Sequence, residues 1–150
     1  MMKKNYNESS YYKIIDNIYI GNIWSPKLIT KDENITDIVS FIKLPDDTIK
    51  SIADTYNYYY YKIENDGDED ILSQFNKMKE FLHTKLFVDK SKILFVCFCG
   101  KSCSVAILLL ILLEFYNYDF YEAINLIYDK ISYQMNHKFY NDIKSVYYKK

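Results

Sequence analysis

The chain has 150 residues, 49% of them hydrophobic, and a formal net charge of −1. That length fits a single domain, and the near-zero charge excludes a general attraction to nucleic acid or to an anionic membrane. All 19 residues counted as Lys or Arg are lysines. Arginine alone offers a rigid, permanently charged fork that grips phosphate through two parallel hydrogen bonds. Any mechanism that needs an arginine finger or an arginine clamp is therefore excluded.

Targeting and redox signals are weak. The stretch Met1–Asn7 is polar, which does not fit a signal peptide, and the longest apolar run, Val105–Leu113, is shorter than the about 20 residues that span a bilayer. Three cysteines lie within Cys97–Cys103, an odd number that implies no disulfide framework. We therefore expect a soluble protein of a reducing compartment, the cytoplasm, without a cofactor.

Strands dominate the first half of the predicted fold. Short strands are expected at 17–21 and 36–41, and an aromatic, β-prone run follows at 58–63. The polar segment Asn65–Asp70 contains a glycine and is expected to be a loop. After this loop the spacing of apolar residues changes.

Helices dominate the second half. Apolar residues recur every three or four positions from Ile71 to Leu86, which predicts an amphipathic helix with Asp70 as a plausible cap. The continuous apolar run Lys92–Cys97 predicts a strand buried on both faces. Further helices are expected at 105–115, 120–131 and 139–146. The predicted architecture is an α/β fold with a central mixed or parallel sheet flanked by helices.

The segment Phe95–Ser104 carries the chemical information. It leaves a buried strand and enters a buried helix, so backbone N–H groups and the helix dipole point at one spot. Such a loop favours the binding of an anion. Cys97 lies where a thiolate would be stabilised and is a candidate nucleophile.

At these residues the chain resembles the dual-specificity protein phosphatases, whose signature is His-Cys-x-x-Gly-x-x-Arg-Ser/Thr. Cys97 matches the nucleophile, and Ser104 matches the hydroxyl that assists departure of the thiolate. The resemblance implies that the phosphate-binding loop consists of Phe98, Cys99, Gly100, Lys101 and Ser102. Val96 stands in place of the His, and Cys103 in place of the Arg that binds two phosphate oxygens. The resemblance also implies that Asp66, 31 positions before Cys97, occupies the general-acid position.

The resemblance extends from about Ile14 to Ile143. We therefore divide the chain into an amino-terminal extension, residues 1–13, and one dual-specificity-phosphatase-like domain, residues 14–150. Small phosphatases of this family occur in large DNA viruses, including poxviral forms. Together with a composition that favours A/T-rich codons, this suggests a viral source and the cytoplasm of a host cell.

The departures from the signature indicate a pseudophosphatase. Attack of a thiolate on a phosphate dianion needs compensating positive charge, and the loss of one preorganised donor typically costs about 10²–10³ in rate. Cys103 is short and neutral, and Lys101 lies two positions earlier, where family side chains point outward. We expect a protein-binding role, with a partner that is phosphorylated or contacts a surface outside the pocket.

Other interpretations stay open. One is a weak or altered protein tyrosine/serine/threonine phosphatase that uses Cys97 and Asp66 with help from Lys101. A second is a thiol redox or sulfur-transfer protein, and a third is a homodimer formed through the amino-terminal segment. A zinc site is disfavoured because neither histidine lies near the cysteines in sequence, and the acidic loop lacks the pattern of a calcium loop.

Overall fold

The structure is a computed structural model that describes residues 11–29, 33–63, 70–97, 103–131, 135 and 137–148. Within these residues five strands form one sheet, in the order β1-β2-β5-β3-β4. Their bounds are Tyr11–Ile15 (β1), Ile18–Gly21 (β2), Asp37–Ser40 (β3), Asn57–Tyr60 (β4) and Ile93–Val96 (β5). The β1–β2 pair is antiparallel, and the other three pairs are parallel. The sequence prediction of an α/β fold with a mixed, mostly parallel sheet is confirmed.

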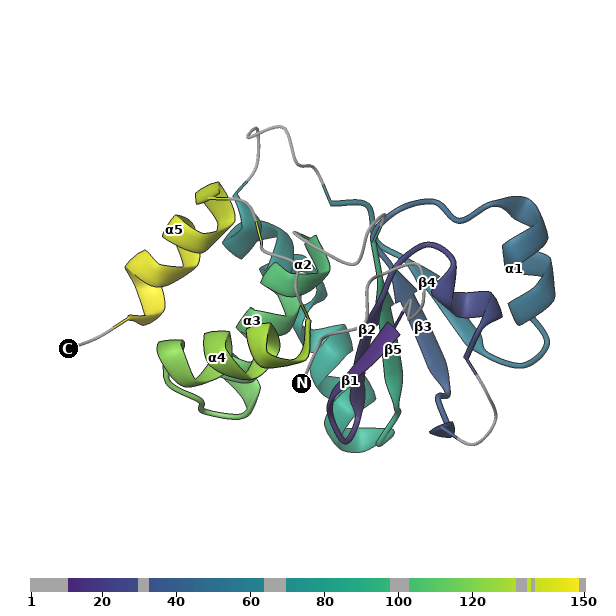
Figure 1. The fold of residues 1–150 in the computed structure, drawn as a ribbon, viewed down its shortest axis with the longest axis horizontal. Coiled ribbons are helices and arrows are strands. Elements are labelled where there is room, and N and C mark those ends of the chain that lie inside the picture. Colours follow the sequence, from purple (N-terminus) through teal and green to yellow (C-terminus); the bar gives the residue numbers. More distant parts are fainter. Residues whose placement is uncertain are drawn as a thin grey trace.

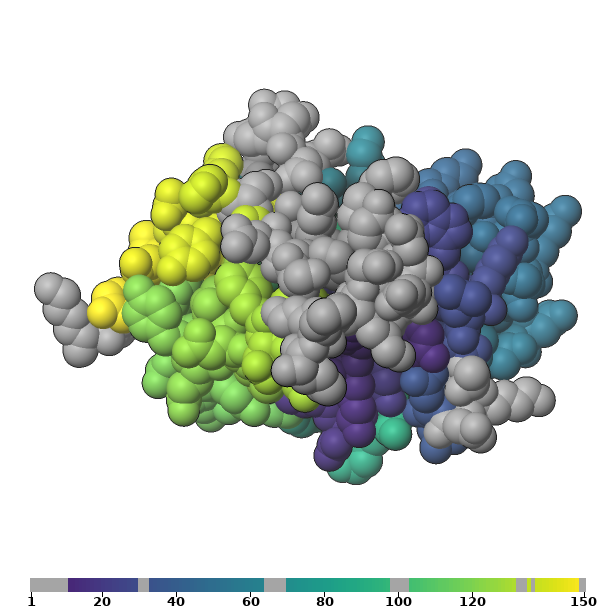
Figure 2. All heavy atoms as spheres, in the orientation of Figure 1, coloured from purple at the N-terminus to yellow at the C-terminus, as the bar shows by residue number. Residues whose placement is uncertain are grey.

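Helices cover both faces of the sheet (Figure 1). On one face lie α1 (Asp46–Ile52) and the short 3₁₀ helix η1 (Ser25–Lys27). The other face carries the larger core, built from α2 (Ile71–His83), α3 (Cys103–Phe115), α4 (Phe120–Lys130) and α5 (His137–Tyr147). In the space-filling view, blue atoms of the α1 layer and green and yellow atoms of α4 and α5 lie at opposite ends of the molecule (Figure 2).

Helix α2 begins at a local capping signal and continues into a wider turn. The Asp70 carboxylate accepts a hydrogen bond from the backbone N–H of Ser73 at 2.7 Å, which confirms Asp70 as the helix cap. Past His83 the helix does not end but widens into a π-helical turn, η3 (Thr84–Val88). This turn brings Lys85 beneath the start of β3, where its ammonium lies 3.1 Å from the Asp37 carboxylate.

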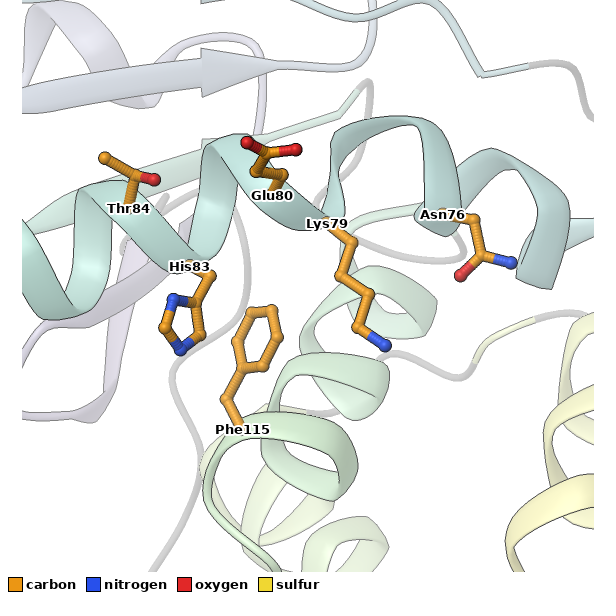
Figure 3. A pocket seen from close by; sticks show the side chains of 6 residues that line it. All are labelled: Asn76, Lys79, Glu80, His83, Thr84 and Phe115. Atoms are coloured by element: carbon orange, nitrogen blue, oxygen red, sulfur yellow. The ribbon is translucent and has the colours of Figure 1, made fainter.

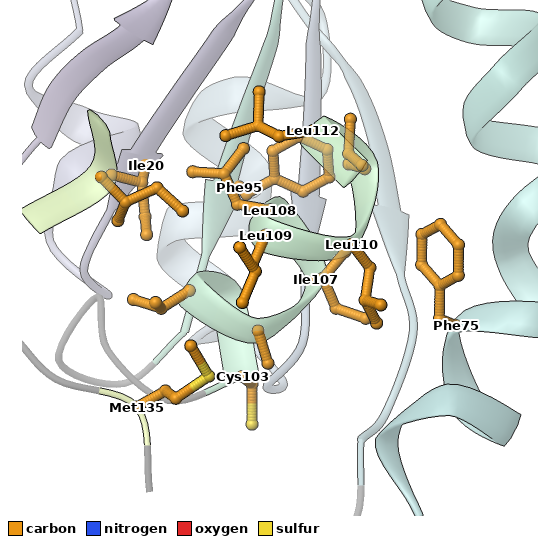
Figure 4. Packing of buried hydrophobic residues seen from close by; sticks show 14 of the residues in the cluster. Ile20, Phe75, Phe95, Cys103, Ile107, Leu108, Leu109, Leu110, Leu112 and Met135 are labelled. Carbon is orange, nitrogen blue, oxygen red and sulfur yellow. The ribbon is translucent and has the colours of Figure 1, made fainter. Parts of the chain in front are cut away.

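Helix α3 is the centre of the core. Eleven of its thirteen residues are buried, so it has no polar face, as its apolar sequence predicts. Its leucines and isoleucines pack against Phe95 and Ile20 of the sheet and against Phe75 of α2 (Figure 4). Because α3 is held on all sides, its first residue, Cys103, has a fixed place relative to β5.

Among the described strands and α-helices, two were not predicted from the sequence. Strand β1 begins at Tyr11, so residues 11–13 of the predicted extension pair with β2 at the edge of the sheet. The other is α1, which is only seven residues long and too short to show a helical period. Among the described residues, no helix is long and apolar enough to cross a membrane.

Candidate functional site

The candidate site lies at the carboxyl edge of the parallel strands. Gly21, Val96 and Ser40 are in register at the ends of β2, β5 and β3. Cys97 follows β5 directly, and its backbone N–H donates to the Gly21 carbonyl at 3.3 Å. Polar residues that follow neighbouring parallel strands converge at such an edge, where ligands of α/β folds bind. The sheet therefore fixes the position of Cys97.

Helix α3 supplies the second part of the site. It begins at Cys103, whose side chain lies beside Met135 at the amino-terminal end of the helix (Figure 4). Burial, with the nearby Cys97 thiol as the smaller cause, raises the pKa of Cys103 to about 12. Cys97 and Cys103 are both buried, and neither forms a disulfide within the described part of the chain. At neutral pH Cys103 is therefore an uncharged group at the entrance of the helix.

The predicted loop lies outside the described residues. Phe98, Cys99, Gly100, Lys101 and Ser102 are not among them, and Asp66 is not either. Their roles remain predictions.

The residues on either side of this loop are described. Val96 is fully buried and packs in the cluster on the α1 face, opposite to the α3 face that holds Cys97. Asp70 is the described member of the predicted acidic loop, and the hydrogen bond from the Ser73 N–H lowers the pKa of its carboxyl group.

Asn22 is a site residue that the sequence analysis missed. It follows Gly21 and is 0% exposed. Its side-chain oxygen accepts from the Trp24 N–H at 3.0 Å, and its backbone oxygen accepts from the Ser25 hydroxyl at 2.7 Å. Its side-chain Nδ2 and the Ser104 Oγ are both buried and have no hydrogen-bond partner in the described part of the chain. A polar residue directly after a predicted strand was the available signal.

No group of three or more potential metal ligands gathers within the described ranges. One open cavity of about 470 Å³ lies along α2, with His83 and Phe115 in edge-to-face contact at 5.3 Å (Figure 3). A second cavity, of about 570 Å³, lies between η1 and α1 and is lined by Pro26 and Tyr56 among others. Neither is lined by Cys97, so neither belongs to the candidate site.

Comparison with known proteins supports the same family. Residues 57–140, more than half of the chain, match the family model described as the Rit1 DUSP-like domain. No curated protein sequence matches the chain.

Solved structures show the same fold at low identity. The PTP-2 phosphatase of Cydia pomonella aligns with a TM-score of 0.78 at 14% identity, over 91% of this chain and 89% of that one. The human tyrosine phosphatase-like serine/threonine/tyrosine-interacting protein aligns with a TM-score of 0.72 at 19% identity, over 91% and 94%. Human DUSP28 aligns with a TM-score of 0.74 at 12% identity, over 98% and 97%.

Proposed function

The chain belongs to the Rit1 DUSP-like domain family, and within that family we propose that it is a pseudophosphatase, a phosphatase-like scaffold that binds a protein partner without turnover. The proposal concerns only catalysis and binding. The phosphatase-like fold itself is established by the structural matches.

One observation carries the proposal: Cys103, at the position where the resemblance places an arginine, is buried and holds its proton. With a pKa of about 12 it is neutral at physiological pH, and if it ionised it would repel a phosphate dianion. No guanidinium can supply positive charge, because the chain has no arginine. A lysine ammonium binds phosphate as a point charge and cannot make the two parallel hydrogen bonds of a guanidinium.

A binding role fits the surface that lies outside the site. Trp24 and Leu28, on either side of η1, are each 55% exposed, so this surface offers two apolar side chains to a partner. One structural neighbour is itself described as a phosphatase-like interacting protein, so the same fold occurs in a protein with that description. We propose that the partner is a protein, phosphorylated or not, and that binding takes place in the cytoplasm. If the source is viral, this is the cytoplasm of the host cell.

Hydrolysis of p-nitrophenyl phosphate tests the proposal. The wild-type chain is expected to give no rate above that of Cys97→Ser. A robust rate that Cys97→Ser abolishes would instead establish the second candidate, a weak phosphatase, for which the placement of Cys97 between a buried strand and α3 is the supporting observation.

The reverse substitution, Cys103→Arg, tests whether the site is inherited. Alone it restores the arginine of the signature, and together with Val96→His it restores both charged positions. Recovery of hydrolysis would mean that the loop geometry is kept and only the charge is missing. A folded variant without activity would mean that the loop geometry has changed as well.

A further inference from the structure

The buried amide of Asn22 presents a hydrogen-bond donor with no described partner. Burying an amide N–H without a partner is costly, and such groups in a folded protein call for an explanation. Asn22 is fully buried, and its Nδ2 has no partner in the described part of the chain. Its Oδ1 accepts from the Trp24 N–H, which fixes the orientation of the amide and leaves the NH₂ group on the other side.

The sheet register places this donor beside Cys97. Ile20 pairs with Phe95 and Gly21 pairs with Val96, so Asn22 is the next neighbour of Cys97. Ile20 and Phe95 both face α3 (Figure 4). Since side chains alternate along a strand, Asn22 and Cys97, each two positions later, lie on that same face.

A second buried group without a described partner belongs to α3. Ser104, in the first turn of α3, is 0% exposed, and its hydroxyl has no partner among the described residues. The residue that the register places beside Cys97 and the second residue of α3 thus each carry a fully buried donor, in a chain without arginine. Neutral donors of this kind stabilise negative charge, because a hydrogen bond to a charged group is stronger than one between neutral groups.

We infer that Asn22 is a positioning residue that stabilises negative charge on the Cys97 sulfur, directly or through one bound water, and thereby keeps Cys97 a reactive thiol. The Ser104 hydroxyl has the role that the resemblance implies, and Asn22 is the addition that this structure makes. The inference is independent of the proposed binding role, since a thiol can be reactive whether or not the chain binds a partner.

A purely structural role for Asn22 would need only its oxygen. Aspartate offers the same oxygen to the Trp24 N–H and has nearly the same shape, but it replaces the donor by an acceptor. Asn22→Asp therefore separates the two roles. Asn22→Leu removes the donor without adding charge. Ser25→Ala is the matched control, because the Ser25 hydroxyl donates to the backbone oxygen of Asn22 and not to its side chain.

The test is the pH dependence of Cys97 alkylation. The thiol proton first goes to solvent; the Cys97 thiolate then attacks the iodomethyl carbon of iodoacetamide, so that the sulfur–carbon bond forms and iodide leaves. The rate at Cys97 is measured by peptide mass spectrometry between about pH 5 and pH 9, and its midpoint is the thiol pKa. The ultraviolet absorbance of the thiolate, with Cys97→Ser subtracted, gives the same midpoint without a reagent.

We expect a wild-type midpoint below the ordinary cysteine value of about 8.5. Both Asn22 variants are expected to raise it by about one pH unit, which slows alkylation at pH 7 about tenfold. Ser25→Ala is expected to leave it unchanged. A wild-type midpoint at or above about 8.5, or a folded Asn22→Asp with the wild-type midpoint, would overturn the inference. If Asn22→Leu does not fold, Asn22→Asp decides, because it keeps the bond to Trp24.

Discussion

Replacing Lys85 by methionine should destabilise the fold far more than replacing an ordinary surface lysine. The Lys85 side chain is 15% exposed, and its ammonium lies 3.1 Å from the Asp37 carboxylate, which is 1% exposed. The Thr36 hydroxyl donates a hydrogen bond to the other oxygen of that carboxylate, Oδ1, at 2.6 Å. The ammonium also lies 4.9 Å from the centre of the Tyr59 ring. The pair therefore joins η3 to the first residue of β3.

The expected cost follows from the charge that is left behind. Methionine keeps the apolar stem of Lys85, so the main change is an unpaired buried carboxylate at Asp37. Breaking a buried pair from one side typically costs about 3–5 kcal/mol. The matched control is Lys79→Met, which removes the partner of Glu114 in a pair whose side chains are 43% and 27% exposed. Exposed pairs of that kind contribute at most about 1 kcal/mol.

The pH dependence gives an independent check. Hydrogen bonding to Tyr59, followed by hydrogen bonding to Asp37, raises the pKa of Lys85 above its ordinary value of 10.5. A raised pKa in the folded state means that the stabilisation is fully present below the unfolded value of 10.5 and is lost as the pH rises above it. The difference in unfolding free energy between wild type and Lys85→Met should therefore be constant near neutral pH and shrink in alkali.

Urea denaturation followed by circular dichroism measures these free energies. The double variant Asp37→Asn with Lys85→Met should recover at least half of the unfolding free energy that Lys85→Met loses. It removes the unpaired buried charge of Asp37 and keeps an acceptor for the Thr36 hydroxyl. The argument is refuted if Lys85→Met costs no more than Lys79→Met, or if the double variant is less stable than Lys85→Met alone.

Three other predictions concern the thiol, the core helix and a cap. Cys103, with its pKa raised to about 12 by burial and by the nearby Cys97, should resist iodoacetamide at pH 8 in the folded protein; alkylation at the rate of the urea-unfolded chain would contradict this. Leu109→Ala, at a fully buried position of α3, should lower the unfolding free energy by about 2–5 kcal/mol. The control Val88→Ala, at a position 70% exposed, should change it by less than about 0.5 kcal/mol. Equal losses would show that α3 is not the core helix. Asp119→Ala removes the carboxylate that accepts the Glu122 N–H in the α4 capping box and should cost about 1 kcal/mol, against a few tenths for Asp142→Ala in an exposed pair of α5. The two variants unfolding at the same temperature would disprove the role of the cap.

The sequence by itself determined the elements that have a local signature. The apolar run before Cys97 predicted a buried strand, and the helix without a polar face predicted the centre of the core, because residues in regular structures repeat with a fixed period. Asp70 was recognisable as a cap because a cap acts on its own first turn. The motif around Cys97 and Cys103 is local too, which is why the resemblance could be seen without a structure.

Only the tertiary structure decided which distant residues meet. Asn22 lies beside Cys97 because β2 pairs with β5, and Lys85 reaches Asp37 because η3 turns beneath β3. Neither contact leaves a periodic mark in the sequence, since it depends on strand order and register rather than on neighbouring residues. The missing arginine was visible at once from composition. The folded chain shows that a buried, neutral thiol occupies this position. It also shows that the nearby Asn22 Nδ2 has no hydrogen-bond partner among the described residues. Both findings depend on burial, which only the folded chain defines.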